Sequence, residues 1–145
     1  MTTRIAIDTS AIYAILCGEV DASLHLSAIR RARGLLMSAL TAFECRSVLL
    51  RRFNMSKVWE FDAFLEETGT QLLPFDGEQA VVAFTAYGRF GRGSGHKAQL
   101  NYGDCASYAL SRSASAPLLF KGKDFIHTDI IAALPLLVPE AGVSQ

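Results

Sequence analysis

Four acidic residues stand where the chain is predicted to leave its strands, and their type and position could build a metal site. Each lies at or just beyond the carboxyl end of a predicted strand, or at the start of the helix that leads into one: Asp8, Glu44, Asp104 and Asp124. Ligands of open α/β sheets bind outside these carboxyl ends, so the four side chains are expected to converge. Gathered carboxylates repel one another unless a positive charge intervenes, and hard oxygen ligands suit Mg²⁺ or Mn²⁺. The pattern therefore predicts a Mg²⁺ site in which Mn²⁺ can substitute.

Each acid also has a purely structural interpretation. Glu44 stands three residues after Thr41, the spacing of a capping box. Asp104 can cap its own helix, Asp8 can form a turn into the next helix, and Asp124 can be a loop acid. Their convergence at one edge of the sheet is what favours the metal site. The sequence has no HExxH, no paired Cys and His ligands and no GxxxxGK[ST] phosphate loop, so no site of those kinds competes.

Alternating strands and helices must position these acids. Apolar segments bounded by polar or turn residues predict strands at 4–8, 35–39, 71–75 and 117–120, and a short last strand at 136–138. Helical spacing predicts helices at 10–17, 20–33, 41–53, 56–67, 76–87 and 104–113, with a flexible glycine-rich loop at 88–96. This order predicts an α/β fold with a mostly parallel sheet of four to five strands flanked by helices. No repeat or linker interrupts it, so residues 1–145 are predicted to form a single domain.

The composition is that of a folded chain whose charges balance. Of 145 residues, 50% are hydrophobic and 19% are charged, which excludes intrinsic disorder. The 14 basic residues balance the 14 acidic ones, so the net charge indicates no class of partner. The three cysteines, Cys17, Cys45 and Cys105, have no CxxC spacing and predict buried free thiols in a reducing compartment, the cytoplasm. The apolar run before Asp8 is too short for a secretory signal, and a later run broken by Pro135 is too short to cross a membrane.

Four segments carry a resemblance to a known family: IAIDTSA at 5–11, SALTAFE at 38–44, HKAQLNYGDCASYA at 96–109 and PLLFKGKDF at 117–125. In these segments, and over nearly its whole length, the chain resembles PIN-domain proteins, specifically the VapC-type toxin ribonucleases of bacterial toxin–antitoxin pairs. LNYGDC together with LLFKGKDF is the most specific part. Many relatives carry an acid or asparagine where this chain has Gly122, so the fourth acid is either Asp124 or Asp129.

The resemblance implies a three-layer PIN-like fold and Mg²⁺-dependent endonucleolytic hydrolysis of RNA by a metal-activated water. In that reading Asp8 and Asp104 are the principal ligands, Glu44 is a ligand or orients the water, and Asp124 serves a second metal or supports the site. Three further side chains are expected to hydrogen-bond the ligands or the substrate: Thr9, Ser10 and Asn101. Three basic residues of the glycine-rich region are expected to hold the RNA backbone: Arg89, Arg92 and Lys97.

The same resemblance implies a homodimer that is held in check by a small antitoxin, and a mean hydropathy of +0.25 is consistent with apolar surface kept for partners. A basic antitoxin residue is expected to reach the acids and compete with Mg²⁺. Two alternatives stay open. One is a catalytically silent protein of the same fold that only binds RNA or a protein. The other is a receiver-type Mg²⁺-binding signalling module, although no aspartate ends the predicted strand 71–75.

Overall fold

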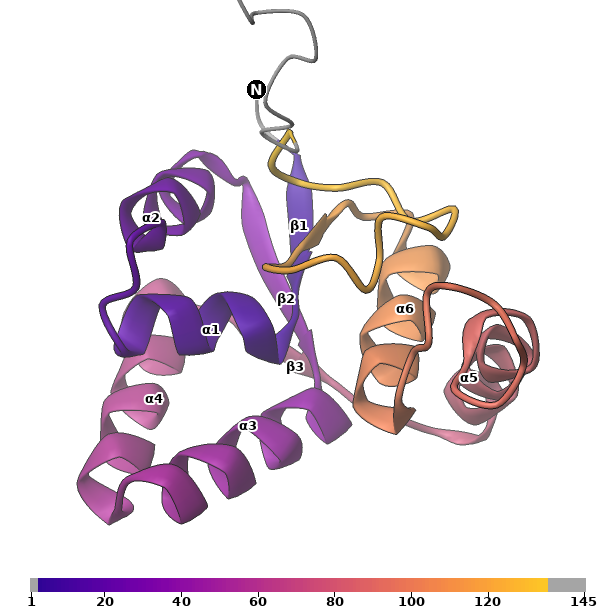
Figure 1. Cartoon of the computed structure of the whole chain (residues 1–145). Coiled ribbons are helices and arrows are strands. Elements are labelled where there is room, and N and C mark those ends of the chain that lie inside the picture. Colours follow the sequence, from indigo (N-terminus) through magenta and orange to yellow (C-terminus); the bar gives the residue numbers. More distant parts are fainter. Residues whose placement is uncertain (1–2, 136–145) are drawn as a thin grey trace, which may run out of the picture.

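Strands and helices alternate through residues 3–135, the part of the chain that the computed structural model describes (Figure 1). In chain order the elements are β1 (Arg4–Ile7), α1 (Thr9–Leu16), α2 (Ala22–Arg31), β2 (Gly34–Ser38), α3 (Ala39–Arg52), α4 (Met55–Thr68), β3 (Gln71–Leu73), α5 (Gly77–Phe90), α6 (Tyr102–Ala114) and β4 (Leu118–Leu119). The predicted α/β class is confirmed. The strand predicted at 136–138 lies outside the described residues, and the single domain over 1–145 stays a prediction.

The strands form one parallel sheet in the order β3-β2-β1-β4. Ile5 of β1 pairs with Leu35 of β2, and Ile7 of β1 pairs with Leu119 of β4. The order reverses at β1, because the chain continues to β2 and β3 on one side of it and returns to β4 on the other. Such a reversal opens a crevice at the carboxyl ends of the strands. This crevice is where the sequence predicts the acids to meet.

Helices cover both faces of the sheet and complete the three layers, with α1 to α4 on one side and α5 and α6 on the other (Figure 1). Successive side chains of a strand point to opposite faces. Ile5 and Ile7 therefore pack into the apolar cluster of the α1 to α4 layer, whereas Ala6 between them packs into the cluster of the α5 and α6 layer. Burial on both faces explains why the strands are apolar at nearly every position. No helix within the described part is long and apolar enough to span a bilayer.

Helices α1, α3 and α6, which position the acids, all begin earlier than the sequence predicts. Helix α1 begins at Thr9, because the Asp8 carboxylate accepts the backbone N–H of Ser10 and is itself the N-cap. Helix α6 is capped by Asn101, which places Asp104 in its first turn rather than at the cap. Asp8 and Asp104 are thus both held by the start of a helix, next to backbone N–H groups that favour negative charge.

The start of α3 corrects one structural interpretation of Glu44. Ser38 caps this helix through a hydrogen bond from the backbone N–H of Leu40, so Thr41 is a buried residue inside the helix. The predicted Thr41–Glu44 capping box is therefore wrong, and the Glu44 carboxylate is left to interact with other elements. Helix α5 also runs further than predicted and includes the first residues of the expected 88–96 loop.

Candidate active site

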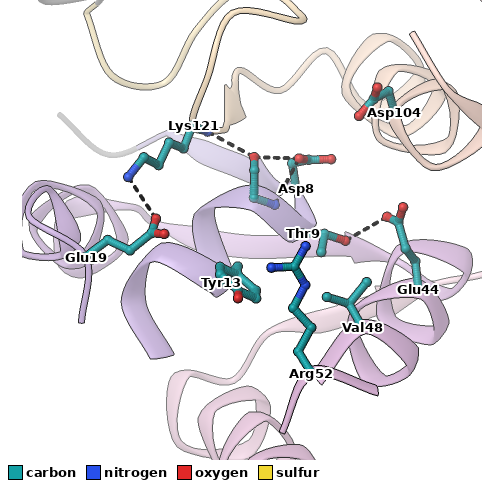
Figure 2. A pocket seen from close by; sticks show the side chains of 10 residues that line it. Asp8, Thr9, Tyr13, Glu19, Glu44, Val48, Arg52, Asp104 and Lys121 are labelled. Carbon is teal, nitrogen blue, oxygen red and sulfur yellow. Dashed lines mark hydrogen bonds and ion pairs between the residues drawn. The ribbon is translucent and has the colours of Figure 1, made fainter. Parts of the chain in front are cut away.

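A cleft of about 400 Å³ at the carboxyl ends of β1 and β2 brings three of the four predicted acids together. Asp8 enters it from the junction of β1 and α1, Glu44 from α3 and Asp104 from the start of α6. Figure 2 shows Glu44 and Asp104 reaching toward Asp8 from separate helices. Thr9 and Ser10, both predicted to support the site, line the same cleft.

Asp8 is the most tightly held of the acids and is only 3% exposed. One carboxylate oxygen accepts the backbone N–H (3.1 Å) and the hydroxyl (2.6 Å) of Ser10, and the other accepts the hydroxyl of Ser107 on α6 (2.5 Å). Because Ser107 donates its only proton to Asp8, the hydroxyl of Thr41 must donate to Ser107 (3.2 Å). Hydroxyls from α1 and α6 therefore fix both oxygens of this carboxylate, and a hydroxyl from α3 orients Ser107.

Glu44 lies between α1 and α6. The hydroxyl of Thr9 donates to one of its carboxylate oxygens (2.8 Å), and the carboxylate rests against the backbone at Gly103. A Cβ atom at position 103 would overlap that carboxylate. Glycine at 103 thus allows this carboxylate to lie against the start of α6, next to Asp104.

Asp104 is oriented by a reciprocal capping box with Asn101. The backbone N–H of Asn101 donates to the Asp104 carboxylate (3.0 Å), and the backbone N–H of Asp104 donates to the Asn101 side-chain oxygen (2.8 Å). Asn101 was expected to hydrogen-bond ligands or substrate. Its backbone N–H donates to the Asp104 carboxylate, and its side chain caps the helix that carries this acid.

The electrostatics of the cleft penalise a full set of negative charges. Burial raises the pKa values of Asp8 and Glu44, and the charge of Asp8 raises that of Glu44 further. For Asp104, burial together with the charges of Asp8, Asp124 and Glu44 raises the pKa to about 7. None of the ion pairs formed within residues 3–135 involves Asp8, Glu44 or Asp104. Within the described part of the chain, these three acids therefore have no ion-pair partner.

The donor set fits a hard divalent cation, which would supply that charge. Within the described residues, no three acidic, histidine or cysteine side chains lie close enough together to hold a metal ion between them. An ion bound here would take few ligands from the protein and keep several waters, as Mg²⁺ does. The side chains of the cleft that could ligate a cation offer oxygen atoms, and no histidine or cysteine lines it, which suits Mg²⁺ better than zinc.

Comparison with known proteins identifies the fold and the family. Residues 5–131 match the family model of the PIN domain. The chain belongs to the PIN-domain family. Ribonuclease VapC42 of Mycobacterium tuberculosis is 44% identical to this PIN domain over 124 residues, which are 86% of this chain and 95% of that protein.

Solved structures agree at the level of the fold. VapC20 of M. tuberculosis, described as a toxin that cleaves the sarcin–ricin loop, superposes on this PIN domain with a TM-score of 0.72 at 16% identity. The match covers 90% of this chain and 99% of that one. A chain of a toxin–antitoxin complex from Klebsiella pneumoniae superposes with a TM-score of 0.64 at 15% identity, over 84% of this chain and 90% of its own. The predicted VapC-type ribonuclease family is confirmed, and the receiver-type alternative is wrong.

The fourth acid of this PIN domain is set apart from the other three. Asp124 is exposed and does not line the cleft, yet its charge contributes to the raised pKa of Asp104. Asp129 faces elsewhere, since it accepts the hydroxyl of Tyr108 (2.7 Å). Gly122 has a φ of 102°, which side chains other than glycine rarely adopt, so the backbone explains why no acid stands there. Between the two alternatives, the geometry favours Asp124.

The basic residues predicted to hold RNA lie outside the cleft. Arg89 is directed toward Asp129 (3.9 Å) and over the ring of Phe90. Arg92 and Lys97 are exposed on the loop between α5 and α6.

The cleft also contains residues that the sequence reasoning did not select. Lys121, Glu19, Tyr13 and Arg52 line it, and Ser107 supports Asp8 from behind. Ser107 could have been predicted from the sequence, because it stands three residues after Asp104 and therefore on the same face of the helix. No sequence pattern marks the other four residues, since they reach the cleft only through the packing of α1, α3 and the segment after β4.

Proposed function

We propose that this PIN domain is a Mg²⁺-dependent endoribonuclease toxin that hydrolyses RNA phosphodiester bonds at the cleft of Asp8, Glu44 and Asp104. The observation that carries the proposal is that three carboxylates from three elements share one cleft, have raised pKa values and form no ion pair with a described residue. A protein gains nothing in stability from such a cluster, so a function for it is the simpler account. The same intact set of acids argues against a catalytically silent protein.

The hydrogen bonds of each acid indicate its role in the reaction. Asp8, with both oxygens fixed, and Asp104, oriented by its capping box, would hold the ion. Bound Mg²⁺ lowers the pKa of a coordinated water and stabilises charge on the phosphoryl oxygens. Glu44 is positioned by Thr9 to orient the attacking water and to accept its proton. Asp124, nearer to solvent, would serve a second ion or support the first.

Basic residues at a distance from the cleft would guide the rest of the RNA. Arg92 and Lys97 are exposed and free to contact phosphates, which bind without regard to base sequence. Arg89 could join them only by leaving Asp129.

An exposed apolar surface supports the homodimer. Val81 and Phe84 stand three residues apart on one face of α5 and are 65% and 75% exposed. Tyr102, 76% exposed at the start of α6, lies beside Tyr87 with ring centroids 5.3 Å apart, which extends the surface across both helices. We propose a second copy of the chain as its occupant. Light scattering at micromolar concentration should give a dimer for the wild type and a monomer for Phe84→Glu, and a monomeric wild type would contradict the proposal.

An antitoxin with a basic residue, most simply an arginine, would reach the same acids and compete with Mg²⁺ through charge-assisted hydrogen bonds. The toxin–antitoxin complex from K. pneumoniae, one chain of which shares this fold, agrees with such a partner. We place this pair in the cytoplasm, where the buried thiols of Cys45 and Cys105 stay reduced. Inhibition that persisted after every basic residue of the antitoxin's contacting segment was neutralised would contradict this arrangement.

Incubation of the protein with total RNA tests the catalytic proposal. Fragments should appear with Mg²⁺ and should not appear with EDTA. Because the nucleophile is water rather than the ribose 2′-hydroxyl, the new ends should carry no 2′,3′-cyclic phosphate. Cyclic phosphate ends, or cleavage that continues unchanged in EDTA, would contradict the proposed mechanism.

A further inference from the structure

An arginine at the far end of α3 reaches into the cleft from the same helix face as Glu44. Glu44, Val48 and Arg52 stand four residues apart in succession, and all three line the cleft. Figure 2 shows the Arg52 side chain extending from α3 toward Thr9, with its guanidinium beside Tyr13. No feature of the sequence distinguishes Arg52 from the other arginines of this helix.

The two cations of the cleft differ in how they are engaged. Lys121 forms ion pairs with Glu19 (2.8 Å) and Asp21 (3.1 Å), so its charge is already neutralised by these two carboxylates. Arg52 forms no ion pair with any residue in 3–135, and its guanidinium lies over the ring of Tyr13, 5.8 Å from the centroid. A cation–π contact of this kind orients a guanidinium without neutralising it. Arg52 is therefore the positive group of the cleft that is left to bind an anion.

We propose that Arg52 binds a phosphate of the RNA that lies across the acid cluster, and that Tyr13 is the positioning residue that holds its guanidinium. The inference rests on the proposed ribonuclease function. A polyanion is repelled by the carboxylates of Asp8, Glu44 and Asp104, so a cation beside them is needed to seat the strand. The guanidinium has five N–H donors in a planar fork, which matches two phosphate oxygens at once.

A purely structural role for Arg52 exists and can be separated from this one. Arg51 and Arg52 both lie in the last turn of α3, where a positive charge interacts favourably with the helix dipole. Arg51 is exposed but does not line the cleft. Arg51→Gln therefore removes the same dipole contribution from the same turn and leaves the cleft untouched, which makes it the matched control.

Binding should be measured in an Asp8→Asn background, so that the RNA is not cut. A fluorescein-labelled random-sequence pool of short single-stranded RNA is titrated with the protein by anisotropy, in Mg²⁺ and over a series of salt concentrations. Arg52→Gln should raise the Kd about tenfold, as expected for loss of a charged hydrogen-bond donor. It should also reduce the slope of log K against log salt by about 0.7, which is one single-strand phosphate contact. Arg51→Gln should leave the slope unchanged.

Two further variants distinguish binding from folding. Arg52→Lys keeps the charge without the fork, so it should restore the salt slope while the Kd recovers only in part. Tyr13→Leu should weaken binding, whereas Tyr13→Phe, which keeps the ring, should not. With Asp8 restored, Arg52→Gln should raise KM for RNA cleavage and leave kcat unchanged, because the contact is present before and during reaction.

The proposal is overturned if Arg52→Gln binds RNA with the Kd and salt slope of Arg51→Gln while the wild type cleaves RNA. The cation would then belong to the surface that meets a protein partner. If the wild type bound this RNA pool but did not cleave any RNA with Mg²⁺, the ribonuclease proposal would fail while the Arg52 contact could still be read from the salt slope. The two failures are therefore distinguishable.

Discussion

Replacing Asp104 by asparagine should make the metal-free protein more stable, although it should remove activity. Burial and the neighbouring charges of Asp8, Asp124 and Glu44 raise the pKa of Asp104 to about 7, so at higher pH the folded state carries a charge that the site disfavours. Asparagine has no such charge. Its side-chain oxygen can still accept the backbone N–H of Asn101, so the capping box that starts α6 keeps this hydrogen bond.

The magnitude follows from the pKa difference between the folded and unfolded chain. A rise from 3.8 to about 7 corresponds to about 4 kcal/mol when Asp104 is fully ionised, since one pKa unit is worth about 1.4 kcal/mol. Asp104 is only partly buried, and solvent screening should reduce this to about 2 kcal/mol. Because the folded pKa is the higher one, the stability is fully present below the unfolded pKa and is lost as the pH rises through about 7. The advantage of Asp104→Asn should therefore grow with pH.

Urea unfolding of both proteins in EDTA, from about pH 5 to about pH 8, measures this difference in the free energy of unfolding. Glu67→Gln, on the exposed surface of α4, removes one negative charge far from the cleft and is the control. The control should show no advantage that grows with pH. A gap between wild type and Asp104→Asn that was the same at both ends of the range would refute the reasoning, as would a variant less stable than wild type at pH 8.

Two further substitutions test how the acids are held. Gly103→Ala should push the Glu44 carboxylate aside and reduce RNA cleavage at least about tenfold, while changing the free energy of unfolding by less than about 1 kcal/mol because the end of a flexible side chain moves. Gly88→Ala is the control, because a Cβ atom at this position inside α5 meets open space. It should stay active, and its free energy of unfolding in urea should rise by up to about 1 kcal/mol. Equal activity of the two variants would refute this role of Gly103. Ser107→Ala should cost about 1.5–3 kcal/mol by removing a donor from the Asp8 carboxylate. That loss should shrink as the pH falls through the raised pKa of Asp8, and a loss independent of pH in unfolding measurements would show that Ser107 does not act on the charged form.

The positions of the acids could be predicted because the sequence shows where the strands end. Apolar runs that stop at a polar residue place Asp8 after β1, and the topology of a parallel sheet then brings the acids of different segments to one edge. The error over Thr41 has a physical cause, since a serine one turn earlier offered an equally good cap and the helix starts there.

The features of the site that could not be predicted from the sequence depend on tertiary packing. The approach of α6 to Glu44 is visible at Gly103 only once both helices are placed, because a glycine in a helix start has several explanations. Arg52 is one of several arginines on or near α3, and nothing local distinguishes the one that meets Tyr13. The fourth acid was ambiguous for the same reason: Asp124 and Asp129 lie five residues apart in a loop, and only its folded path sends Asp129 to Tyr108.

The most direct test of the central claim is the rate of RNA cleavage by Asp8→Asn in saturating Mg²⁺, measured beside the wild type and Glu67→Gln. Asparagine keeps the size of the side chain and an oxygen for Ser107, but it removes the charge that the ion requires. We predict a loss of more than about 100-fold, larger than the 10- to 100-fold typical of residues that only support a ligand, with Glu67→Gln at the wild-type rate. An Asp8→Asn protein that cleaved RNA at the wild-type rate would contradict this prediction.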